Sequence, residues 1–163
     1  MEPLIRYFEG ERQAGLLCAA LGAASLGAAL WAWRHGDAFR WAMVPLLAVG
    51  LVQLGVGVGL TLRTPPQVAA LERDLASGAA DAPAARAREL ARMERVSKSF
   101  RLIEAAEVAL LVAGAVVTLA LRERATWVGI AMALCIEAAV MLAFDVFAEE
   151  RAHAYLRWLS GAA

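Results

Sequence analysis

Four stretches of this sequence are apolar over about twenty residues each, the length that a helix needs to cross about 30 Å of hydrocarbon. They cover residues 14–33, 41–62, 102–121 and 126–147. Lipid offers no partner for backbone N–H and C=O groups, and the alternating pattern of barrel strands is missing, so we expect helices. Apolar types make up 61% of the 163 residues, and the mean hydropathy is +0.57. The sequence therefore predicts an all-α integral membrane protein with four transmembrane helices in an up-down bundle.

The rest of the composition excludes several other classes of protein. Lys and Arg number 16, as do Asp and Glu, so there is no basic excess for binding nucleic acid. Two cysteines, Cys18 and Cys135, are too few for a disulfide scaffold, and the apolar content excludes intrinsic disorder. No nucleophile elbow, phosphate-binding glycine loop or His-Glu-x-x-His motif occurs. We therefore favour a protein that is not an enzyme, and we predict no organic cofactor.

The distribution of Lys and Arg predicts the orientation in the membrane. With an even number of spans, both termini and the middle segment 63–101 share one side, and that side holds twelve Lys and Arg residues against four. The positive-inside rule therefore places the termini in the cytoplasm. Four of the tryptophans lie at the ends of the spans away from the cytoplasm, where an interfacial aromatic belt is expected: Trp31, Trp33, Trp41 and Trp127. One lysine against fifteen arginines, together with abundant alanine, suggests a bacterial genome of high GC content, so we expect the bacterial inner membrane.

The middle segment, residues 63–101, is predicted to form a cytoplasmic helical hairpin. Thr64-Pro65-Pro66 should end the second span and begin a new helix, and residues 77–83 resemble a turn. A single helix is then expected from about Ala84 to Leu121. The modest basic excess of the segment suits a protein partner or anionic lipid, or simply reflects topology. Residues 4–8 and 155–159 are expected to form terminal helices that lie along the membrane surface.

Polar side chains within the apolar runs are the main candidates for function. Glu137 is at the midpoint of the fourth run, and Gln53 is just past the midpoint of the second, so they should share one depth and meet. An ionisable group at the bilayer centre costs about 2.5–3.5 kcal/mol on insertion scales and seldom faces lipid. Together with Glu107 and Asp145, this pair suggests a proton or cation pathway. The alternative is a neutral acid and an amide that only join two helices.

A second acidic group is expected near the cytoplasmic face. Its members are Glu104, Glu107, Asp145, Glu149 and His153. Oxygen ligands with one imidazole would suit a divalent cation, although the paired Glu-x-x-His motif of di-iron bundles is absent. The alternative is a network of ion pairs with arginines at the interface.

Small residues mark candidate contacts between helices. Gly22 and Gly27 lie in the first run, and Gly55 and Gly59 are four residues apart in the second. Such residues let helix backbones approach closely, either within one bundle or in a homo-oligomer.

The function that these patterns favour is a small polytopic membrane protein that acts through assembly or partner binding, as an accessory subunit or a protective, immunity-type protein. Its partners would be the lipid bilayer, further copies of the chain or a protein at the hairpin. An oligomeric proton or cation channel or transporter is the alternative, and a metal-dependent membrane enzyme is a weaker one.

Overall fold

The computed structural model describes residues 2–75 and 82–161, which form helices and no strand. The helices are α1 (Glu2–His35), the short 3₁₀ helix η1 (Asp37–Ala42), α2 (Met43–Asp74), α3 (Ala82–Ala120) and α4 (Ala125–Ser160). Within these ranges, four helices are long and apolar enough to cross a membrane. The prediction of an all-α, multi-pass membrane protein is confirmed at this level, and α3 is the single long helix expected from Ala84 onward.

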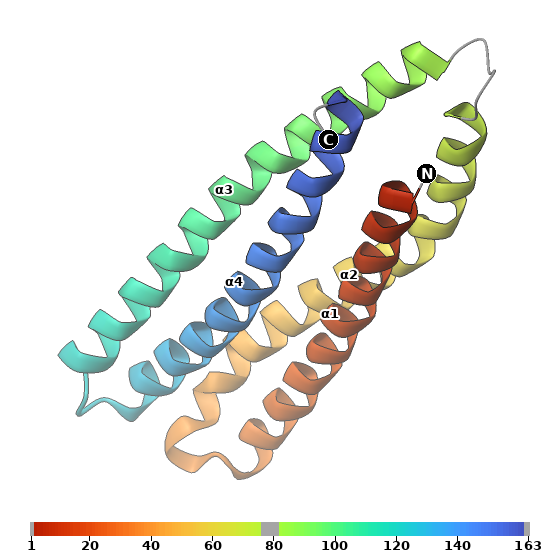
Figure 1. The fold of residues 1–163 in the computed structure, drawn as a ribbon. Helices are drawn as coiled ribbons and strands as arrows, with labels where there is room; N and C mark the ends of the chain where they lie inside the picture. Colours follow the sequence, from red (N-terminus) through yellow and green to blue (C-terminus); the bar gives the residue numbers. More distant parts are fainter. Residues whose placement is uncertain (1, 76–81, 162–163) are drawn as a thin grey trace.

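The helices associate as two pairs. The most extensive contacts join α1 to α2 and α3 to α4, while α4 also lies against η1 and α1 (Figure 1). Contact between α2 and α3 is slight, so the predicted up-down bundle is not confirmed. Both termini lie toward one end of the molecule, called here the terminal end. The turns after α1 and α3 lie at the other, the turn end (Figure 1).

Each long helix exceeds the thickness of a bilayer. Their lengths are 34, 32, 39 and 36 residues, or about 48–58 Å at a rise of 1.5 Å per residue. The expectation of separate terminal helices on the membrane surface is wrong, because residues 4–8 and 155–159 continue α1 and α4 without a break. Burial explains this continuity, since Leu4 and Tyr155 are 0% and 1% exposed.

The expected break at Pro65-Pro66 is also wrong, because α2 passes through both prolines and ends at Asp74. Proline removes one backbone donor and crowds the carbonyl four residues earlier. Both rings lie on the exposed face of α2, and the Thr64 hydroxyl donates to the Leu60 carbonyl over 2.7 Å. The predicted hairpin stays unconfirmed, because most of its turn falls in residues 76–81, outside the described residues.

The best-packed apolar core lies at the terminal end. Its buried members come from α1, α3 and α4, and the last turns of α2 pack against it. Tyr7 and Tyr155 stack with ring centroids 4.7 Å apart, and Phe8 meets Tyr155 edge-on at 6.0 Å. This core holds together the helix ends that extend beyond the apolar runs.

Candidate functional site

The Glu137 carboxyl group is hydrogen-bonded to side chains from two other helices. Ser25 Oγ of α1 donates to Glu137 Oε1 over 2.5 Å, and Gln53 Nε2 of α2 donates to Oε2 over 2.7 Å. Gln53 is 2% exposed and Glu137 is 6% exposed. The expected meeting of Gln53 and Glu137 therefore occurs, and Ser25 is a partner that the sequence reasoning missed. The sequence shows a hydroxyl three residues after Gly22. Whether that hydroxyl faces α4 is decided only by the tertiary structure.

The Gln53 amide has unused hydrogen-bonding capacity. Its Oε1 atom is buried and has no hydrogen-bond partner among the described residues, while Cys18 Sγ lies 3.4 Å from the Gln53 backbone carbonyl. An ionised carboxylate only accepts hydrogen bonds, whereas a carboxylic acid also donates one. In the observed orientation the amide donates to the carboxylate; after rotation by 180° its Oε1 would accept from the acid. One amide can thus serve both protonation states of Glu137.

Paired glycines set the distance between α1 and α2 at this site. A Cβ on Gly22 would lie 2.7 Å from the Gly50 carbonyl oxygen, and one on Gly57 would lie 2.5 Å from the Gly15 carbonyl oxygen. Gly15 and Gly22 are seven residues apart on α1, and Gly50 and Gly57 are seven residues apart on α2. Residues at this spacing lie on the same face of a helix, about two turns apart. Side chains would force the helices apart, and Ser25 and Gln53 would then separate from Glu137.

The four glycines that the sequence analysis proposed as helix contacts differ in their surroundings. Gly22 lies in the α1–α2 contact, but Cβ atoms at Gly27, Gly55 and Gly59 would have no neighbour within 4 Å. Among the described residues, those three glycines therefore do not pack helices together, and the α1–α2 contact instead uses glycines seven residues apart. Their part in an oligomer stays a prediction.

Two cavities lie close to Glu137 along α4. The turn-end cavity, of about 520 Å³, is lined by Glu137 itself, by Ser25 and by Phe39 of η1. The terminal-end cavity, of about 230 Å³, begins at Met141, one turn from Glu137, and is also lined by Cys18 and Asp145. The hydrogen-bonded carboxyl group thus lines the turn-end cavity and lies one turn of α4 from the terminal-end cavity.

The other predicted pathway residues are placed separately from this site. Asp145 lines the terminal-end cavity, two turns along α4 from Glu137. Glu107 of α3 is 7% exposed, and its Oε2 is buried without a hydrogen-bond partner, as is Glu104 Oε1. Neither Glu104 nor Glu107 is hydrogen-bonded to Glu137. Only Gln53 of the predicted partners therefore touches the central carboxyl group.

The predicted metal-ligand set is only partly brought together. His153 Nε2 lies 3.8 Å from Glu149 Oε1 and 3.3 Å from Ser97 Oγ. Over residues 2–75 and 82–161, no group of three or more His, Cys, Asp or Glu side chains is arranged to hold a metal ion. The proposed set Glu104, Glu107, Asp145, Glu149 and His153 therefore does not form a ligand cluster in this structure.

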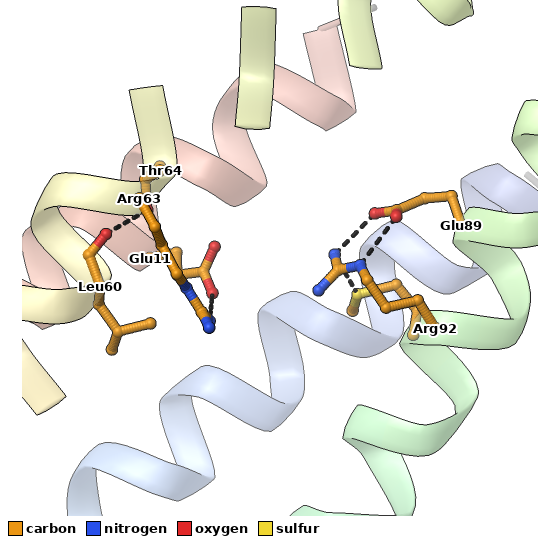
Figure 2. Close-up of polar contacts among 7 residues, drawn as sticks. Glu11, Leu60, Arg63, Thr64, Glu89 and Arg92 are labelled. Carbon is orange, nitrogen blue, oxygen red and sulfur yellow. Dashed lines mark hydrogen bonds and ion pairs between the residues drawn. The ribbon is translucent and has the colours of Figure 1, made fainter. Parts of the chain in front are cut away.

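A second ionic group, formed around the buried carboxylate of Glu89, lies at the terminal end, and the sequence analysis did not predict it. Arg92 donates to both carboxylate oxygens of Glu89, over 2.8 and 2.7 Å, as Figure 2 shows. Tyr155 donates to Glu89 Oε1 over 3.3 Å. Burial, followed by the charge of Glu89, raises the pKa of Tyr155 above its ordinary value, so the phenol stays a donor. The i,i+3 spacing of Glu89 and Arg92 was a signal in the sequence for an ion pair, but the sequence did not show that Glu89 is buried.

A further ion pair lies nearer the apolar runs. Arg63 Nη2 of α2 lies 3.2 Å from Glu11 Oε1 of α1 (Figure 2). The second carboxylate oxygen of Glu11 is buried without a hydrogen-bond partner. Arg63 and Glu11 both line the terminal-end cavity, which is therefore polar where it meets the end of the spans.

Comparisons of this chain with protein-family models, with curated proteins and with solved structures found no match.

Proposed function

We propose that this chain is a proton-exchanging membrane protein in which Glu137 binds and releases the proton. The observation that carries the proposal is the position of its carboxyl group, which is hydrogen-bonded by two helices, lines one cavity and lies one helical turn from another. A buried ionisable group within membrane-spanning helices is costly, and such groups mark proton and ion pathways. The proposed location is a bacterial inner membrane with the terminal end in the cytoplasm, on the strength of the Lys and Arg distribution.

In the proposed cycle, the proton reaches Glu137 through one cavity and leaves through the other. The carboxylate is held by Ser25 and Gln53; on protonation, the new O–H donates to Gln53 Oε1 as the amide rotates. Asp145 and Cys18 line the cavity on the terminal side, so Asp145 is the acid that would exchange protons with water there. The turn-end cavity, which Glu137 lines directly, supplies the other entrance.

Proton flux into liposomes tests this proposal. The full chain is reconstituted with a pH-sensitive dye inside, a potassium gradient and valinomycin, and the wild type is compared with Glu137→Gln. We expect flux in the wild type and a fall to the level of protein-free liposomes in the variant, because the amide cannot release a proton. Glu150→Gln is the matched control, since Glu150 is an exposed carboxyl group on the same helix.

Two results would contradict the proposal. One is a wild type that carries no protons at any pH or voltage tested. The other is flux that survives Glu137→Gln, which would move the pathway away from this carboxyl group. Gln53→Met sharpens the test further, because it keeps the side-chain length but removes the amide that serves both protonation states.

Assembly or partner binding is the second candidate function. It is favoured by two exposed small residues, Gly55 and Gly59, which lie one turn apart on α2 and pack against none of the described residues. A second copy or a partner helix could approach closely there. Mass measurement in detergent, comparing the wild type with Gly55→Leu, tests this, and a monomeric wild type would contradict self-assembly.

A further inference from the structure

Two hollows follow one another along α1 and α4 from the apolar runs toward the terminal end, and together they are called the groove. Its apolar part, of about 300 Å³, is lined by Leu17 of α1 and by Phe144 and Phe147 of α4. Its polar part, of about 420 Å³, is lined by Arg6, Arg157 and aromatic side chains. Arg151 lines both parts and so joins them.

The position of Arg151 matches the headgroup level of a bilayer. It follows Phe147 by one helical turn, about 6 Å along the axis. Phe147 ends the last apolar run, so the apolar part of the groove lies at the depth of acyl chains and Arg151 lies just beyond it. Such an arrangement presents an apolar surface and a cation at the spacing of a lipid tail and its phosphate.

The cationic groups of the groove are largely free to bind an anion. Among the described residues, Arg151 and Arg157 have no carboxylate within 4.0 Å, whereas Arg6 pairs with Glu2 at 2.6 Å. Glu2 is the acidic residue that lines the polar part of the groove, against three arginines. The balance of charge in this part of the groove therefore favours a negatively charged ligand.

Local packing holds Arg151 in this place. A Cβ atom on Gly10 would lie 2.7 Å from Arg151 Cδ and 2.8 Å from its Nε. The Arg151 stem therefore crosses the α1 backbone where no side chain stands, and the side chain is half-buried. A guanidinium that is already held in place loses less conformational entropy when a ligand binds than a free surface arginine does. Its planar arrangement of N–H donors suits a phosphate group.

We propose that this groove binds an anionic diacyl phospholipid, with an acyl chain along Leu17, Phe144 and Phe147 and the phosphate at Arg151. Arg157 and Arg6 lie on the headgroup side and add attraction for a negatively charged headgroup. A zwitterionic lipid would gain less, because its own ammonium group would face the same arginines. The site is independent of the proton-exchange proposal, since none of these residues contacts Glu137 through a hydrogen bond.

Native mass spectrometry of the full chain in maltoside detergent tests the site, with dioleoyl phosphatidylglycerol and dioleoyl phosphatidylcholine as probes. We expect the wild type to retain phosphatidylglycerol preferentially and Arg151→Gln to bind it about tenfold more weakly. Arg73→Gln is the matched control, since it removes the same charge from an exposed part of α2. Circular dichroism and the thermal midpoint of each variant verify that it is folded.

A second variant tests the apolar part of the groove without removing charge. Ala143 lines that part and is exposed, so Ala143→Trp fills it from the surface. We expect loss of phosphatidylglycerol binding with Arg151 intact, and only weak competition by glycerol phosphate, which has the phosphate but no tail. Equal retention of the two lipids by the wild type would overturn the proposal. So would undiminished binding in either groove variant.

Discussion

The terminal end and the membrane-spanning half of this protein are stabilised by different kinds of contact. At the terminal end, large side chains such as Phe8, Met93 and Tyr155 are at most 1% exposed. In the spanning half, the close contacts are made by glycines such as Gly22 and Gly57 and by the hydrogen bonds of Glu137. Only 11% of the residues in the most apolar stretch of α3 are buried, so this part of the helix mainly faces outward.

The two solvents account for this difference. In water, burial of apolar surface contributes about 25 cal/mol per Å², so large aromatic and aliphatic side chains form a core. In lipid that term is absent between helices, because acyl chains are as apolar as leucine, and close backbone contact and hydrogen bonds remain. The same helices α1 and α4 therefore change their mode of packing along their length.

The largest effect is expected from the terminal-end core. Phe8→Ala should lower the free energy of unfolding by about 3–5 kcal/mol, because it leaves a cavity beside Tyr155. Thermal unfolding in detergent measures the change. Leu119→Ala is the control, since Leu119 is 76% exposed and its loss removes no packing. Similar shifts in both variants would break the distinction between a packed end and an outward-facing span.

An intermediate effect is expected from the glycine contact between α1 and α2. Gly57→Ala should cost about 1–3 kcal/mol, because its Cβ would meet the Ala19 backbone nitrogen at 2.4 Å. Gly59→Ala, two residues away in open space, should be neutral or stabilising, since alanine has the higher helix propensity. Equilibrium unfolding in a denaturing detergent compares the two. Equal losses would show that backbone approach at Gly57 does not join the helices.

The smallest effect is expected from the hydrogen bonds within the spans. Ser25→Ala should lower stability by about 0.6 kcal/mol, the average for hydrogen bonds between membrane helices. The same unfolding assay applies, with Ser99→Ala as control, since the Ser99 hydroxyl bonds only the Arg95 carbonyl of its own helix. A loss as large as that of Phe8→Ala would reverse the ranking and make the Glu137 contacts the main stabilising feature of the spans.

Part of the candidate site was predictable from the sequence, and part was not. The depths of Gln53 and Glu137 follow from counting residues along apolar runs, and their contact was predicted correctly. Ser25 was missed because a serine in an apolar helix has no signal that tells which neighbour it faces. In the second run the sequence favoured Gly55 and Gly59 for their four-residue spacing, whereas the glycines in the α1–α2 contact, Gly15 with Gly22 and Gly50 with Gly57, are seven residues apart.

The sequence by itself determined that this chain is helical and has four stretches long and apolar enough to cross a membrane, because runs of about twenty apolar residues satisfy their backbone groups in lipid only as helices. Tertiary structure decided which helices pair, how far α2 continues past Pro65 and Pro66, and that the chain ends build a core instead of lying on the membrane surface. These properties depend on which faces of long helices meet. Apolar composition is nearly the same on every face of a spanning helix, so only close contact in three dimensions distinguishes them.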